Sequence, residues 1–140
     1  ILLPAPVVDP RTEITAVLAA IHDALRRDPW AIHLIVNDKL AGPSILPAIE
    51  RIFAALAAAG LTARDCRAAY ALLWHYTAGE LIDTHHTDPD SYSRRMVRSA
   101  DPNTYPALTA AITASPDGPS SDWFIENLQR LLDGLLPARR

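Results

Sequence analysis

The chain of 140 residues is long enough for one domain with a sizeable buried core. Its hydrophobic fraction is 49%, but aromatic residues make up only 6%, and this balance favours packed helices over a β-sheet. One cysteine, Cys66, excludes a disulfide framework, a formal net charge of −3 argues against binding of a nucleic-acid backbone, and no apolar run reaches the roughly 18 residues of a membrane span.

The first element that the sequence predicts is an amphipathic helix that begins at Asp9. Residues 1–9 hold two prolines and no helical period, so we interpret them as a connector from a missing N-terminal part. Asp9 suits the N-cap and Pro10 the first helical position. The apolar stripe that follows consists of Ile14, Val17, Leu18, Ile21 and Leu25. Residues 10–140 are then expected to form one domain.

Two further helices are expected before residue 60. Asp28 and Pro29 restart a short helix, on which Trp30, His33 and Asn37 share one face. Gly42-Pro43 ends this segment, and Ser44 is expected to cap a third helix that ends at Gly60, a glycine suited to the position after a helix. The stripe of that helix is Ile45, Ile49, Ile52, Phe53 and Leu56.

The stretch from Thr62 to His86 predicts the central helix of the domain. Thr62 and Asp65 form an approximate capping box at its start. Apolar residues cover nearly every face between Ala68 and Ala78, and a helix that is hydrophobic all round is expected to be buried all round. With only one linker residue between them, the third helix and this one should form an antiparallel hairpin.

The C-terminal third is expected to end in a helix with two apolar rows. Residues 87–104 predict a mobile, partly helical connection, residues 105–113 a short helix, and residues 121–136 the last helix. Its first row is Phe124, Leu128, Leu131 and Leu135, and its second is Ile125, Leu132 and Leu136. One row can face the core of the domain. The other needs a partner, and a symmetric copy is the commonest one.

Enzymatic signals are weak. No Ser-His-Asp pattern, phosphate-binding glycine loop or pair of catalytic carboxylates is present. His75 is equally compatible with a core histidine and with a contact to a ligand. An alternative hypothesis is a small helical enzyme or metal-binding protein that uses His75, Asp83, His85 and His86.

The order of the motifs resembles the C-terminal ligand-binding and dimerisation domain of the tetracycline-repressor (TetR) family. Residues 26–31 (RRDPWA) are similar to the family's "R-x-[HD]-P-W". Residues 42–44 (GPS), Glu50 and residues 59–61 (AGL) are similar to its "GPN…E…L…AGL" hairpin. The segments that also fit are HYTAGELID (75–83), YPAL (105–108) and, after Phe124, LLDGL (131–135). The likeness spans most of the chain.

The resemblance implies an all-α homodimer that is not an enzyme, needs no cofactor or metal and works in the cytoplasm. Family members carry an N-terminal helix-turn-helix domain, which would bind DNA for this chain, and release DNA when a small molecule binds.

The expected pocket, for an apolar or aromatic effector, consists of Trp30, His33, Asn37, Ile49, Ile52, Phe53, Tyr70, Trp74 and His75. The expected dimer interface consists of Leu81, Phe124, Leu128, Leu131 and Leu135. Residues 35–40 (IVNDKL) replace the metal-chelating His and Arg-Pro pair of the tetracycline repressor, which argues against tetracycline with magnesium.

Overall fold

A computed structural model of the chain is all-helical over the residues it describes, which are all except 38–41, 86–87, 89, 115–120 and 139–140. The α-helices are α1 (Pro10–Arg27), α2 (Pro29–Asn37), α3 (Leu46–Ala58), α4 (Ala63–His85), α5 (Tyr92–Arg98), α6 (Pro106–Ala114) and α7 (Ser121–Leu135). A 3₁₀ turn, η1 (Pro43–Ile45), precedes α3. The expected all-α fold class is confirmed.

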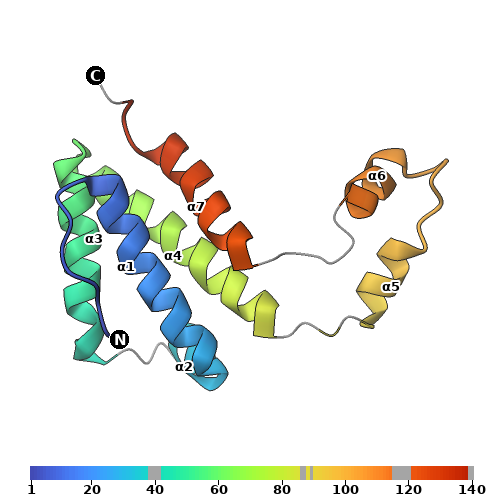
Figure 1. The fold of residues 1–140 in the computed structure, drawn as a ribbon, viewed down its shortest axis with the longest axis horizontal. Coiled ribbons are helices and arrows are strands. Elements are labelled where there is room, and N and C mark those ends of the chain that lie inside the picture. The colour runs from blue at the N-terminus through green and yellow to red at the C-terminus, as the bar shows by residue number, and fades with distance from the viewer. Residues whose placement is uncertain (38–41, 86–87, 89, 115–120, 139–140) are drawn as a thin grey trace.

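Helices α1, α2, α3, α4 and α7 form one bundle, in which α1 and α4 each contact the other four (Figure 1). The predicted stripe of α1 is buried without exception. It packs with apolar residues of the other four helices, including Ile32, Ile52, Leu73 and Leu128. Within the described residues, no helix combines the length and the apolarity that crossing a membrane requires.

Local signals in the sequence account for most of the helix ends. The Asp9 carboxylate accepts a hydrogen bond from the Thr12 N–H at 3.0 Å, as an N-cap does. Gly60 has φ +99°, and the Leu61 N–H donates to the Leu56 carbonyl, which is the pattern of a Schellman C-cap. The Asp65 N–H donates to the Thr62 hydroxyl at 3.2 Å where α4 begins.

One predicted cap is wrong. Ser44 lies inside the 3₁₀ turn, and α3 begins only at Leu46, after an N-cap residue, Ile45, that makes no side-chain capping bond. Pro43 and Pro47 explain the difference, because each suits the first positions of a helical segment and together they divide the segment in two.

The N-terminal segment, residues 1–9, is not free of the bundle. Leu3 packs against the core, and the Arg51 guanidinium of α3 donates to the Pro4 carbonyl at 2.7 Å. The same guanidinium contacts the Glu13 carboxylate of α1 at 2.5 Å, and the other oxygen of that carboxylate accepts from the Val7 N–H at 2.8 Å. One buried ion pair therefore fastens the segment to α1 and α3.

Helices α5 and α6 form an arm that projects from the bundle (Figure 1). Among the described elements they contact each other and no helix of the bundle. The turn between them is held by Asp101, which accepts hydrogen bonds from the Thr104 hydroxyl at 2.6 Å and from the Asn103 N–H at 3.1 Å. The bond from Thr104 lowers the pKa of the Asp101 carboxyl.

Candidate functional site

A cavity of about 700 Å³ opens where α1, α2, the η1–α3 segment and α4 meet. Its walls are apolar and aromatic side chains with few polar groups, as in most small-molecule sites. The lining residues are Ile1, Ile21, Ala24, Leu25, Asp28, Trp30, Ala31, Leu34, Ile35, Gly42, Ser44, Ile45, Ile49, Tyr70 and Trp74.

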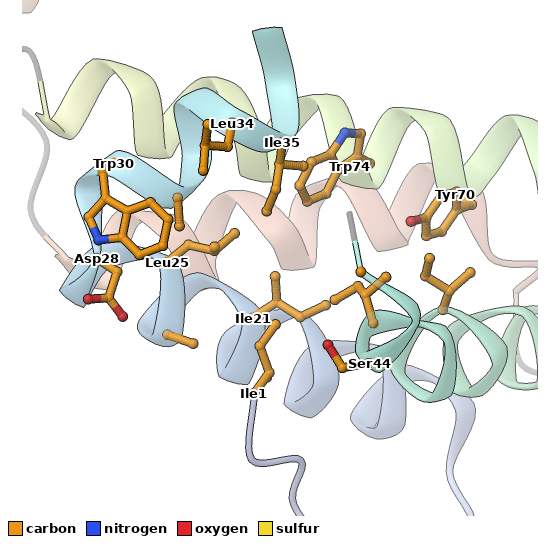
Figure 2. Close-up of a pocket in the computed structure, with 15 residues that line it drawn as sticks. Ile1, Ile21, Leu25, Asp28, Trp30, Leu34, Ile35, Ser44, Tyr70 and Trp74 are labelled. Carbon is orange, nitrogen blue, oxygen red and sulfur yellow. The ribbon is translucent and has the colours of Figure 1, made fainter. Parts of the chain in front are cut away.

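The cavity is elongated between two aromatic ends (Figure 2). Trp30, at the start of α2, lies at one end beside Asp28, while Trp74 and Tyr70 of α4 lie at the other. Ile21 and Leu25 of α1 lie between these ends. Pro29 separates α2 from α1, because a proline disfavours the helical conformation in the residue before it, and Asp28 accordingly leaves the helical region at φ −121° and ψ 75°.

Few polar groups reach the cavity. The Tyr70 ring stacks on Phe53 with centroids 5.0 Å apart, and burial raises the pKa of its hydroxyl, which is therefore a neutral hydrogen-bonding group at pH 7. Ser44 contributes a hydroxyl. Asp28 is the charged side chain of the lining, and Ile1 carries the N-terminal ammonium. The arrangement suits a largely apolar molecule held by one or two polar contacts.

Of the nine residues that the sequence placed in a pocket, Trp30, Ile49, Tyr70 and Trp74 line this cavity. Others face elsewhere. Ile52 is fully buried in the core, so it supports the cavity without reaching it, and Phe53 borders a separate hollow between α3 and α4. His33 is half-buried and outside the described lining. The side chain of Asn37 lies outside the described residues.

His75, also predicted for the pocket, lies on another face of α4. His75 is exposed and does not line the cavity, although its neighbour Trp74 does. Consecutive residues of an α-helix point about 100° apart, so a helix that presents Trp74 to the cavity directs His75 toward its uncovered side. The sequence left open whether His75 lies in the core or contacts a ligand. In the structure it lies neither in the core nor at this cavity.

Among the histidines whose burial the structure describes, the buried one is His22, which sequence reasoning missed. It is 5% exposed, its Nε2 contacts the Glu80 carboxylate of α4, and its ring stacks on Phe124 of α7 with centroids 4.0 Å apart. Phe124 in turn stacks on Tyr76 of α4. The available signal was spacing, because His22 follows Leu18 by four residues and so extends the apolar stripe of α1.

The residues of the metal-binding alternative do not gather. His75 and Asp83 are eight residues apart on α4, about 12 Å along the axis, which is too far for both to bind one ion. The His85 side chain and all of His86 lie outside the described residues. Among the residues that are described, no group of three or more candidate ligands could hold a metal ion.

Three of the five residues assigned to a dimer interface belong to the core of a single chain. Leu81 and Leu128 are fully buried and Phe124 is 2% exposed, so they have no surface to offer a second copy. Helix α7 packs on α1 and α4 through Phe124, Leu128 and Leu132, a row that mixes the two rows read from the sequence. Leu131 and Leu135 are half-buried.

Helix α4 also departs from its prediction, because it is not buried all round. Ala68, Leu72, His75 and Gly79 are exposed, and their spacing places them along one face of the helix. Leu72 alone is 50% exposed. The helix is apolar on a side that the described part of the chain does not cover.

Residues 3–138 match the family described as tetracyclin repressor-like, C-terminal domain. The chain belongs to this family. The match covers the bundle, the arm and the N-terminal segment together, so this TetR-like domain includes every element described above.

A relative supports the assignment. Over 136 residues the TetR-like domain is 35% identical to an HTH-type transcriptional regulator of Saccharopolyspora erythraea, and the alignment covers 89% of this chain. It covers 55% of the relative, so the chain spans about half of that protein's length.

A solved structure has the same fold. The transcriptional regulator SCO7222, a TetR from Streptomyces coelicolor, superposes with a TM-score of 0.72 over 91% of this chain and 65% of that chain, at 19% sequence identity. At this identity the likeness describes the fold of the TetR-like domain and not its ligand.

Proposed function

We propose that this TetR-like domain senses a small apolar or aromatic molecule and holds two copies of a transcriptional repressor together. The observation that carries the proposal is the cavity of about 700 Å³, walled by two tryptophans, a tyrosine and aliphatic side chains. A concave site of this size, open to solvent at Trp30 and lined mainly by apolar and aromatic side chains, has the character of a small-molecule site.

Helix α1 is in a position to transmit occupancy of the cavity. Ile21 and Leu25 contact the cavity, while His22, between them in sequence, contacts Glu80 and Phe124 on the opposite side. A molecule that displaced α1 would therefore change its packing on α4 and α7. An effect of about 5–150-fold on DNA affinity needs a difference of only about 1–3 kcal/mol between two such arrangements.

A second copy is the proposed partner of the uncovered face of α4. The face is lined by Ala68, Leu72, His75 and Gly79, and exposed apolar residues also lie on α7, at Trp123 and Ile125. A stripe of small and apolar residues allows close approach of a symmetric copy. DNA binding is assigned to a helix-turn-helix domain that would precede this chain, since the chain itself is acidic.

The test of the cavity uses N-phenyl-1-naphthylamine, an uncharged aromatic fluorophore, titrated against the 140-residue chain. We expect its emission to rise on binding and the emission of Trp30 and Trp74 to change. Trp74→Ala should weaken binding at least about tenfold, because it removes one aromatic wall.

Tyr92→Ala is the control, since it truncates an exposed aromatic side chain on α5, outside the cavity and the proposed interface. It should bind the fluorophore within about twofold of the wild-type chain. No binding to the wild-type chain, or equal binding by Trp74→Ala, would contradict the proposed sensor site.

A further inference from the structure

We infer that the molecule that fits this cavity is an amphipathic cation, an apolar body that carries one amine or quaternary ammonium group. The inference rests on the proposed function and gives its ligand a chemical class. Asp28 is the charged side chain of the described lining, and no lysine, arginine or histidine belongs to that lining. The cationic group of the lining is the backbone ammonium of Ile1, so a carboxylate or phosphate ligand would find no basic side chain there to pair with it.

The Asp28 carboxylate is available to a ligand. Asp28 directly precedes Pro29 of α2, a position where an aspartate commonly caps the helix with its side chain. Here the backbone carbonyl of Asp28 accepts from the Ala31 N–H at 2.9 Å, and within the described residues the carboxylate takes part in no hydrogen bond or ion pair. Arg26 and Arg27 precede it, but both are exposed and neither lines the cavity.

Trp30 adds a second feature that favours a cation. Its indole lies next to Asp28 at one end of the cavity and is 65% exposed (Figure 2). The face of an indole attracts an ammonium group, and a carboxylate beside it strengthens the attraction. The charged end of a ligand would lie here, partly in solvent, where a full charge is not stripped of its water.

The rest of the cavity accommodates an apolar body. Leu25, Leu34 and Ile35 follow Trp30 along the cavity, and Trp74 and Tyr70 close its far end (Figure 2). The cavity thus has a carboxylate at one end and apolar walls along the remainder. It suits a molecule whose positive charge lies at one terminus of an apolar body.

Three probes that share a ten-carbon alkyl tail test the charge: decyltrimethylammonium, decan-1-ol and decyl sulfate. The two ions are titrated below their critical micelle concentrations and the alcohol below its solubility limit, and binding is followed by calorimetry and tryptophan emission. We expect the cation to bind about threefold to tenfold more tightly than the alcohol, the range for an exposed cation–π contact and ion pair together. Decyl sulfate should bind most weakly. Added salt should lower the affinity of the cation and leave the affinity of the alcohol unchanged.

Asp28→Asn removes the charge at nearly constant shape and should bring the affinity of the cation to that of the alcohol. Glu50→Gln is the control, because it removes one exposed carboxylate from α3 outside this cavity. It should leave all three affinities within about twofold.

The outcomes separate the two proposals. If none of the probes and no N-phenyl-1-naphthylamine binds, the sensor site itself is wrong. If the neutral probes bind but the cation has no advantage, or Asp28→Asn changes nothing, the cavity stands and the ligand class is wrong. A preference for decyl sulfate would also overturn the class.

Discussion

At the scale of single residues, one partly buried ion pair ties together segments that are far apart in the sequence. The Glu13–Arg51 pair joins α1 to α3 and holds the Pro4 carbonyl and the Val7 N–H of the N-terminal segment. The hydrogen bond from Arg51 lowers the pKa of the Glu13 carboxyl, and the Val7 N–H acts in the same direction, while burial opposes both. The N-terminal segment is thus fixed to the helices that surround the cavity.

Arg51→Met should lower the free energy of unfolding by about 1–3 kcal/mol at pH 7, because it leaves the buried Glu13 carboxylate without its cation. The pKa of Glu13 is lower in the folded chain, so the pair stabilises the fold above the ordinary glutamate value of 4.5 and ceases to do so as the pH falls through the folded pKa. The difference between variant and wild type should therefore shrink in acid.

Urea unfolding at pH 7 and at pH 3 measures this difference. Arg130→Met is the matched control, since Arg130 is exposed and lies 3.8 Å from Glu126 on the surface of α7. Its effect should stay within about 0.5 kcal/mol at both pH values. A cost of Arg51→Met that is the same at both pH values would show that the lost packing, and not the charge pair, matters.

At the scale of elements, the α3–α4 hairpin depends on one backbone conformation. Gly60 has φ +99°, a region that residues with a side chain rarely adopt, and it ends α3 so that α4 can return antiparallel. The two helices then present Ile49 and Tyr70 to the same cavity. A turn at the far end of α3 thus sets one wall of the candidate site.

Gly60→Ala should destabilise the chain by about 1–2 kcal/mol, the cost of a side chain in this conformation. Gly134→Ala should do the reverse, because Gly134 lies within α7 with open space around it, and alanine favours a helix by about 0.5–1 kcal/mol. Denaturation of both variants at one protein concentration provides the comparison. Equal stability of Gly60→Ala and the wild-type chain would contradict the role of this turn.

At the scale of the whole molecule, the bundle leaves apolar surface uncovered along α4 although α4 contacts four other helices. Leu72 is half exposed in the middle of this face, whereas Leu128 on α7 is wholly inside the bundle. Substitutions of these two leucines therefore distinguish an effect on dimer assembly from an effect on folding. A dimer interface on α4 would depend on Leu72 and not on Leu128.

Leu72→Glu should convert the proposed dimer into a folded monomer, because the charge would be buried unpaired at a symmetric interface. Leu128→Glu should instead unfold the subunit. Leu46→Glu, on the exposed side of α3, should remain dimeric. Sedimentation equilibrium and circular dichroism measure the two properties, and a Leu72→Glu protein that stays a stable dimer would place the interface elsewhere.

The sequence alone was sufficient for the features that local interactions determine. Asp9, Pro10, Thr62 and Gly60 act on backbone groups within a few residues, so helix starts, a helix end and the hairpin could be predicted from them. Trp30 and Trp74 could be assigned to one pocket because the motifs around them resemble those of the family.

Only the tertiary structure decided which face of each helix is covered. The α7 row that packs inward is Phe124, Leu128 and Leu132, and sequence spacing alone allowed another choice. The same applies to His22, which is buried against Glu80 and Phe124, and to His75, which is exposed. The physical reason is that burial depends on the approach of residues far apart in the chain. Between Ala68 and Ala78, α4 is apolar on nearly every face, so its sequence does not indicate which side its neighbours leave uncovered.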